Sequence, residues 1–174
     1  MIKFPNPDNK KVYDSDSIHI IREKYNITRK TNIVKDYVNH PGSVLILSFL
    51  DEKILFVKQW RQPVKTYSLE LPSGSLEINE NSIEAADREF REETGFRAKK
   101  YSSLGSYFVA PGYSSEKTEF FLAENLFESA LLPDEDEEIY LEKYSLDNAL
   151  DLITKQIIVD QSTICALLLY KSLL

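Results

Sequence analysis

Acidic side chains gather in the short segment GSLEINENSIEAADREFREETGF, which spans residues 74–96. Within it, Glu89, Glu92 and Glu93 stand at positions i, i+3 and i+4, a spacing that places three carboxylates on one stripe of an α-helix. If that stripe is partly removed from water, two carboxylates about 6 Å apart repel by roughly 3 kcal/mol at an effective dielectric near 20. Such a cluster needs a cation or must take up protons. Hard oxygen ligands favour magnesium, manganese or calcium.

The same glutamates are also compatible with an ordinary solvated surface. Glutamate-rich exposed helices are common, and like charges four residues apart cost only about 0.2–0.5 kcal/mol when they are in water. The three glutamates alone therefore leave open both a metal site and a plain acidic surface.

A helix that positions these carboxylates has clear start and stop signals. Asn81 is a good N-cap, Glu84 completes a capping box three residues later, and Gly95 is a natural C-terminal stop. The apolar stripe at helical spacing, which we expect to face the core, consists of Ile83, Ala86 and Phe90. The glutamate stripe then lies about 100° around the helix, at the edge of the buried face.

The length, net charge and cysteine content of the chain exclude several classes of protein. The chain has 174 residues, a net charge of -7 and one cysteine, Cys165. The negative charge argues against a nucleic-acid-binding protein, and no apolar run approaches the roughly 18 residues of a membrane span. A single cysteine excludes an internal disulfide framework, and the N-terminal sequence lacks the order of a signal peptide. We therefore expect a cytoplasmic protein with neither nucleic acid nor membrane as partner.

The order of apolar runs predicts an α/β (α+β) fold, with a mixed β-sheet sandwiched between α-helices. Residues 1–42, which end at the turn signal Pro41-Gly42, are predicted to form a small N-terminal antiparallel β subdomain, and residues 43–174 the main domain. A hairpin is predicted around Asp51-Glu52. The other predicted elements are strands over 101–110 and 118–126 and helices over 146–156 and 160–174.

The segment over residues 74–96 resembles the Nudix box at every defining position. The matching residues are Gly74, Glu80, Arg88, Glu89, Phe90, Glu92, Glu93, Gly95 and Phe96. So many specified positions rarely coincide by chance. The resemblance implies a Nudix fold, with a loop–helix–loop that binds divalent cations and hydrolyses nucleoside diphosphates linked to another moiety.

The same resemblance implies roles for individual residues. Glu89, Glu92 and Glu93 would hold two or three Mg²⁺ or Mn²⁺ ions together with the backbone carbonyl of Ser73, and Glu93 would also be catalytic. Arg88 would orient the glutamates and contribute to catalysis, and Glu80 would support the loop or the metal shell. Gly74 would let the backbone approach closely, and Gly95 would have a structural role in the motif.

Sequence outside the box resembles the ADP-ribose pyrophosphatase branch of the Nudix family. The resemblance lies in VNHPGSVLILSFLDEKILFVKQWRQPV, LELPSGSLE, APGYSSEKTEFFLAENL and DEDEEI. It implies that Arg61 contacts phosphate and that Trp60 stacks on adenine, with Tyr113 as the alternative. A lone tryptophan near a strand end is otherwise more often part of the core. Pro111, Gly112 and Glu116 would lie on the substrate side. The role of Glu70 stays open.

The acidic loop PDEDEE, residues 133–138, resembles the catalytic loop of that branch. Glu137 aligns with the carboxylate that orients or deprotonates the attacking water, and a shift of one residue would give this role to Glu138. Members with such an N-terminal β unit usually dimerise through it, which implies a homodimer.

The expected function is thus metal-dependent hydrolysis of the pyrophosphate bond of ADP-ribose or a related nucleotide sugar, giving AMP and a sugar phosphate. One alternative is a Nudix hydrolase for ADP-glucose, GDP-mannose, NADH or a dinucleoside polyphosphate. The other is a non-catalytic nucleotide-binding module, which the undamaged box makes the least favoured.

Overall fold

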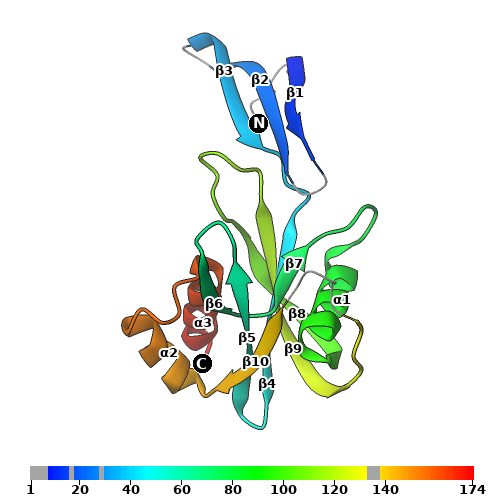
Figure 1. Cartoon of the computed structure of the whole chain (residues 1–174), viewed down its shortest axis with the longest axis vertical. Helices are drawn as coiled ribbons and strands as arrows, with labels where there is room; N and C mark the ends of the chain where they lie inside the picture. Colours follow the sequence, from blue (N-terminus) through cyan, green and yellow to red (C-terminus); the bar gives the residue numbers. More distant parts are fainter. Residues whose placement is uncertain (1–7, 16–17, 28–29, 133–137) are drawn as a thin grey trace. The chain divides into compact units, whose positions relative to one another are not determined.

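The computed structural model describes residues 8–15, 18–27, 30–132 and 138–174 (Figure 1). The chain divides into two compact units. The first consists of residues 1–42 and 108–117, and the second of residues 43–107 and 118–174. A segment from the middle of the chain therefore joins the region predicted as the N-terminal subdomain.

The first unit contains a three-stranded antiparallel sheet in the order β1-β2-β3. Its strands are β1 (Asp8–Asp14), β2 (His19–Ile27) and β3 (Lys30–Val38). Arg22 and Asp36 are cross-strand neighbours, and their side chains form two hydrogen bonds of 2.7 and 2.6 Å. At the end of β3, the Val38 N–H donates to the Tyr113 carbonyl at 2.8 Å, which attaches residues 108–117 to this sheet.

No described side chain of the first unit is fully buried. Val12, Tyr13 and Val34 are large apolar residues of its strands that remain exposed. A small sheet is stable on its own only with three or more strands that share a hydrophobic face, or with a helix packed against it. The strands of the first unit therefore leave part of their apolar side-chain surface exposed to solvent.

The second unit is built on a seven-stranded mixed sheet. The main order is β10-β5-β4-β9-β8, with β6 paired to β5 and β7 paired to β4. The strands are β4 (Ser43–Leu50), β5 (Lys53–Arg61), β6 (Thr66–Glu70), β7 (Ser73–Ser75), β8 (Phe96–Phe108), β9 (Lys117–Glu128) and β10 (Ile139–Tyr144). The parallel pairing of β4 with β9 makes the sheet mixed.

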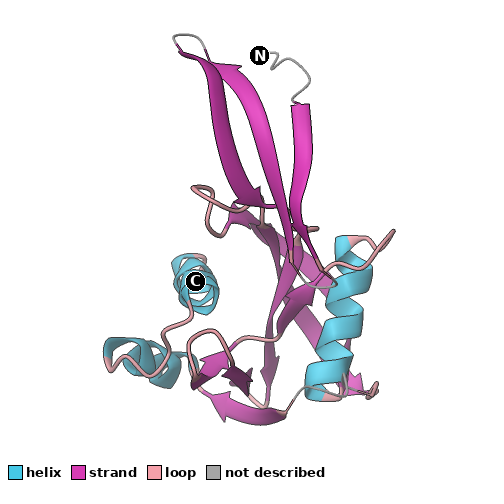
Figure 2. Cartoon of the chain, turned by 45° about the horizontal axis from the view of Figure 1, so that its top comes forward, coloured by secondary structure: helices cyan, strands magenta, loops and turns pink. Residues whose placement is uncertain are grey.

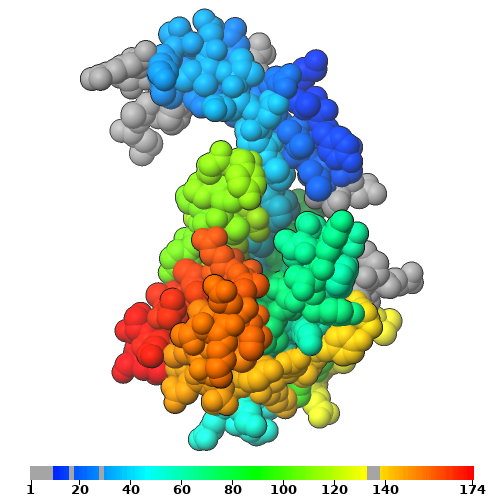
Figure 3. All heavy atoms as spheres, turned by 60° about the vertical axis from the view of Figure 1, so that its left-hand side comes forward, coloured from blue at the N-terminus to red at the C-terminus, as the bar shows by residue number. Residues whose placement is uncertain are grey.

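Helices cover both faces of this sheet, as Figure 2 shows. On one face, α1 (Ser82–Thr94) packs its buried Ala86 and Phe90 in a cluster with Leu55 of β5. On the other face, α2 (Leu146–Thr154) and α3 (Gln161–Ser172) pack in a cluster with Phe56. These two helices lie together on one side of the second unit (Figure 3, orange and red). The predicted mixed sheet between helices is confirmed.

The elements with strong local signals lie where they were predicted. The hairpin turn falls at Asp51 and Glu52, whose φ angles of 52° and 62° suit a tight two-residue connection. Strands β8 and β9 and helices α2 and α3 also confirm their predictions. Strands β6, β7 and β10 were not predicted, because each is only three to six residues long and is defined by its pairing partners.

The predicted apolar stripe of α1 was wrong at Ile83, which is 54% exposed. The buried stripe consists of Ala85, Ala86, Phe90, Glu93 and Thr94. Ile83 belongs to the first turn, and the helix meets the sheet only from its second turn onward. Among the described residues, no helix is long and apolar enough to cross a membrane.

The turn between β6 and β7 depends on a buried side chain of α3. The Thr163 hydroxyl, which has no exposed surface, accepts a hydrogen bond of 2.9 Å from the Leu71 N–H. Thr163→Val would leave this buried N–H without its acceptor, which costs about 1–3 kcal/mol. We expect that loss in the free energy of unfolding measured by urea denaturation.

Two variants make this measurement specific. Thr163→Ser keeps the hydroxyl and should restore most of the stability. Thr154→Val, at an exposed position of α2, should change stability by no more than about 0.5 kcal/mol. Equal losses for the valine and serine variants at 163 would show that the hydrogen bond is not the cause.

Candidate functional site

Helix α1 begins and ends at the predicted residues. Asn81 Oδ1 accepts hydrogen bonds from the N–H groups of Ile83 and Glu84 at 3.1 and 3.0 Å. The Glu84 carboxylate accepts in return from the Asn81 N–H at 3.2 Å, which completes the capping box. Gly95 ends the helix with a φ of 76°, in the left-handed region that glycine adopts readily. The ends of the helix are thus fixed by its own sequence.

The glutamates of α1 do not lie on a solvated surface. The side chains of Glu89 and Glu92 are only 14% and 19% exposed, and Glu93 is 7% exposed. Like charges this close repel more strongly where water is excluded. The alternative of a plain acidic surface therefore does not describe this helix.

Arg88 is the cation at the centre of this acidic cluster. Its guanidinium forms a two-pronged contact with Glu80, with hydrogen bonds of 2.9 and 3.0 Å. Nη1 of Arg88 also donates to Glu89 at 2.8 Å and to Glu92 at 3.0 Å. Nη2 donates to the carbonyl of Ser75 at 3.0 Å, which connects the loop before the helix to the cluster.

Arg88 and Glu80 shift each other's pKa values in opposite directions. Hydrogen bonding to Glu80, together with the nearby Glu89, raises the pKa of the Arg88 guanidinium, so that it stays protonated. The same pair lowers the pKa of the Glu80 carboxyl below its usual value, chiefly through the hydrogen bonds from Arg88. The Arg88–Glu80 pair therefore remains ionised at neutral pH.

Strand β7 brings the backbone against the glutamates. Val44 and Leu45 of β4 pair with Gly74 and Ser73 of β7. The Ser73 N–H donates to the Glu93 carboxylate at 2.9 Å. A Cβ atom on residue 74 would lie 2.0 Å from Cδ of Glu89, so only glycine leaves room for this carboxylate.

The donor set of this cluster suits a hard divalent cation. Carboxylates and a backbone carbonyl are the oxygen ligands that magnesium and manganese accept. Among the described residues, no set of three or more acidic, histidine or cysteine side chains is arranged as a preformed cage. The reason is local: Glu89 and Glu92 are turned toward Arg88, and Glu93 toward Ser73. A bound cation would compete with Arg88 for two of these carboxylates.

Arg61, at the end of β5, lies on the glutamate side of the sheet. Its guanidinium donates to the buried Glu70 at 3.1 and 2.6 Å, and this pairing raises the pKa of Arg61. The carboxylate of Glu93 adds to that effect, so the two groups are electrostatic neighbours. The role that the sequence left open for Glu70 is therefore, at least in part, to hold Arg61.

Trp60 and Glu138 lie on the other side of the sheet. Successive side chains of a strand point to opposite faces, so Trp60 faces away from Arg61. The Trp60 indole N–H donates to Gln62 at 2.8 Å, and its ring lies 5.4 Å from that of Tyr67. Glu138 accepts hydrogen bonds from the hydroxyls of Tyr67 and Tyr140, which raises the pKa of both tyrosines.

The remaining predicted residues belong to the first unit or lie outside the described residues. Pro111, Gly112 and Glu116 belong to the first unit, where Val109 N–H donates to the Glu116 carbonyl at 3.3 Å. Glu137 lies outside the described residues. Sequence reasoning missed Tyr67 and Tyr140, which only the pairing of β6 and β10 with β5 brings near Trp60.

Comparison with known proteins agrees with the family resemblance seen in the sequence. The NUDIX domain family model matches residues 39–160. The chain is 38% identical over 136 residues to a Bacillus subtilis (strain 168) protein named ADP-ribose pyrophosphatase, covering 76% of this chain and 74% of that one. It is 36% identical over 135 residues to the methanol dehydrogenase activator of Bacillus methanolicus, covering 76% and 73%.

A solved structure shows the same fold. The crystal structure of an ADP compounds hydrolase superposes with a TM-score of 0.83 at 22% identity, covering 99% of this chain and 96% of that chain. At this identity the likeness establishes the fold alone.

The Arg88–Glu80 pair predicts a pH-dependent contribution to stability. Because the pKa of Glu80 is lowered in the folded state, its contribution is present above the ordinary carboxyl value of about 4.5 and is lost as pH falls through the lowered pKa. Glu80→Gln should therefore be less stable than the native chain at pH 7. The difference should shrink steadily below about pH 4.5.

Urea unfolding midpoints measured between pH 3 and 7, with chelator present, test this expectation. Glu52→Gln, at an exposed turn position, is the matched control and should follow the native chain throughout. A stability difference for Glu80→Gln that is independent of pH would contradict the assignment.

Proposed function

The chain belongs to the NUDIX domain family, and on this premise we propose that it hydrolyses the pyrophosphate bond of ADP-ribose or a related nucleotide sugar. The products would be AMP and a sugar phosphate. The observation that carries the proposal is the cluster of poorly exposed glutamates gathered around Arg88. The names of the relatives support the substrate, since one of them is an ADP-ribose pyrophosphatase.

We propose that the site takes two or three Mg²⁺ or Mn²⁺ ions. Glu89, Glu92 and Glu93 would hold them, with the Ser73 carbonyl as a further ligand. The carboxylate donors and the space that Gly74 leaves beside Glu89 support this assignment. Such ions, when bound, neutralise diphosphate charge and lower the pKa of a coordinated water.

The side chains around this site have separate tasks in the proposed reaction. Arg88 restrains Glu89 and Glu92, and Glu80 holds Arg88 in place through its two-pronged contact. Without this counter-charge, the carboxylates would repel one another and would no longer be held together. Gly95 supports the site less directly, by ending the helix two residues after the last glutamate.

Arg61 is proposed to bind a phosphate of the substrate. A guanidinium has five N–H donors in a fixed planar fork, and the two hydrogen bonds to Glu70 set its plane. Because Glu70 is buried, the arginine is held before substrate arrives. A preorganised guanidinium gives bidentate anion contacts that a flexible lysine does not.

The proposed water-orienting carboxylate is Glu137, with Glu138 as its alternative. Glu138 is hydrogen-bonded to two tyrosines on the far face of the sheet, which favours Glu137. Pro111, Gly112 and Glu116 are kept as proposed substrate contacts from the resemblance to the ADP-ribose pyrophosphatase branch. The adenine-stacking role proposed for Trp60 is not supported by its position, because it faces away from Arg61.

We also propose a cytoplasmic homodimer that forms through the first unit. The exposed apolar side chains of β1 and β3 support this association, because a partner would cover them. The single cysteine is compatible with a reducing compartment.

The proposed activity is tested by incubating the chain with ADP-ribose, ADP-glucose, GDP-mannose, NADH and diadenosine tetraphosphate, with and without Mg²⁺ or Mn²⁺. Chromatography should show ADP-ribose cleaved best, to AMP and ribose 5-phosphate, and only with metal. Glu93→Gln keeps an oxygen for the Ser73 N–H but removes the charge. It should lower kcat by about 100-fold or more.

Glu52→Gln is the control for this charge change and should retain native turnover. Preferential cleavage of another compound would keep the reaction type and replace the substrate. No turnover with either metal would favour the nucleotide-binding module, and native turnover by Glu93→Gln would contradict the assignment of that residue.

The proposed dimer is tested by light scattering during gel filtration. The native chain should elute with twice the mass of one chain. Val34→Lys, which places a charge at an exposed apolar position of β3, should weaken association more than about tenfold. Thr31→Lys, also exposed on β3, is the matched control. A native chain that is monomeric at every concentration would contradict the proposal.

A further inference from the structure

Two adjoining hollows lie over strands β5, β6 and β10. Their volumes are about 440 and 510 Å³, and both are lined by Lys58, Tyr67 and Glu142. Trp60 and Lys65 line the larger one, and Tyr140 the smaller one. We call the two together the aromatic pocket. Cavities of this size are typical of small-molecule sites.

The aromatic pocket is distinct from the glutamate site because it lies on the opposite face of the sheet. Leu55 of β5 packs in the cluster with α1, and Phe56 packs in the cluster with α3. Side chains alternate along a strand, so Lys58 and Trp60 follow Phe56, whereas Arg61 follows Leu55. A molecule in the pocket would therefore not contact the glutamates of α1.

Aromatic rings dominate the wall of the pocket. The ring of Tyr67 lies 5.4 Å from that of Trp60 and 6.4 Å from that of Tyr140, with edge-on geometry in both pairs. Trp60, Tyr67 and Tyr140 are 44%, 43% and 49% exposed. Aromatic rings that remain this exposed within a concave surface offer faces and edges on which a planar base can stack.

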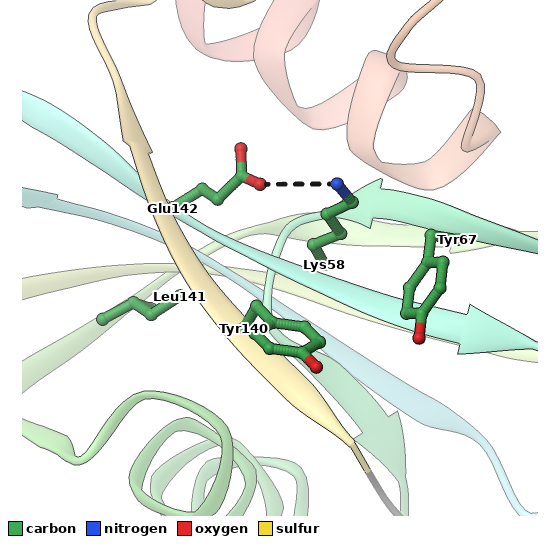
Figure 4. A pocket seen from close by; sticks show the side chains of 5 residues that line it. All are labelled: Lys58, Tyr67, Tyr140, Leu141 and Glu142. Carbon is green, nitrogen blue, oxygen red and sulfur yellow. Dashed lines mark ion pairs between the residues drawn. The ribbon is translucent and has the colours of Figure 1, made fainter.

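Charged side chains accompany the rings. Lys58 Nζ lies 5.9 Å from the centre of the Tyr67 ring and 3.9 Å from Glu142, beyond hydrogen-bond length (Figure 4). Lys65 sits in the turn between β5 and β6, where its N–H donates to the Arg61 carbonyl at 2.9 Å. Two carboxylates lie at the same rings: Glu142 lines both hollows, and Glu138 accepts from the hydroxyls of Tyr67 and Tyr140. The two ammonium groups can still contact an anionic group of a ligand whose planar ring stacks on the aromatic wall.

We propose that the aromatic pocket binds a mononucleotide, with its base against Trp60 and Tyr67 and its phosphate at Lys58 and Lys65. This is a second nucleotide site, separate from the proposed site of hydrolysis. A peptide or a neutral sugar would gain less, since neither combines a planar ring with a phosphate.

Trp60 is the single tryptophan of the chain and so reports directly on this pocket. With metal chelated to prevent turnover, AMP should quench its fluorescence to saturation. Equilibrium dialysis under the same conditions should give the same dissociation constant. Adenosine, ribose 5-phosphate and inorganic phosphate should each bind at least about tenfold more weakly than AMP.

Variants locate the binding. Lys58→Gln and Tyr67→Leu should each raise the dissociation constant of AMP about tenfold, whereas Lys53→Gln, exposed at the start of the same strand, should leave it unchanged. Circular dichroism confirms that each variant is folded. Glu93→Gln, on the other face, should retain the quenching. Because turnover is absent from this assay, its result is independent of the proposed hydrolysis.

Three results would overturn the proposal. The first is that AMP does not quench the fluorescence, and the second is that dialysis shows AMP binding without any change in Trp60 fluorescence. The third is that adenosine or inorganic phosphate binds as tightly as AMP. Loss of quenching in Glu93→Gln but not in Lys58→Gln would place the nucleotide on the glutamate face instead.

Discussion

The repulsion among the carboxylates of α1 is the constraint on which this structure depends. Glu80, Glu89 and Glu92 all direct oxygens at one guanidinium, that of Arg88, in a place where little water reaches them. An arginine is suited to this position because its planar fork serves several acceptors at once and keeps its charge. The helix caps and the glycine of β7 are needed because this arrangement tolerates little displacement.

Both helical layers contribute to the position of the β6–β7 turn. From one face, Glu93 of α1 accepts from the Ser73 N–H, and from the other, Thr163 of α3 accepts from the Leu71 N–H. Between them, the Pro72 carbonyl accepts from the Ile46 N–H at 2.8 Å. Three consecutive residues are thus fixed by three different elements. The core of the second unit serves the candidate site by holding this short piece of backbone.

The features that could be predicted from sequence are those with local causes. Asn81 and Gly95 delimit α1 because capping depends on residues only a few positions away. The positions of Trp60 and Glu138 could not be predicted, because they follow from the register of β5 with β6 and β10. The exposure of Ile83 has a similar origin. The spacing of apolar residues in the sequence shows which residues share one side of α1, but the position of the sheet determines which of them it covers.

Adjacent residues of β5 serve different surfaces, and this limits how the chain can change during evolution. Arg61 is directed to the glutamate side, and Trp60 to the opposite face. A point substitution at either residue alters one surface and spares the other. Insertion or deletion of a single residue within this strand would exchange the two faces at once. We therefore expect length variation among relatives to fall in the turns that flank β5, while the number of residues in the strand itself is retained.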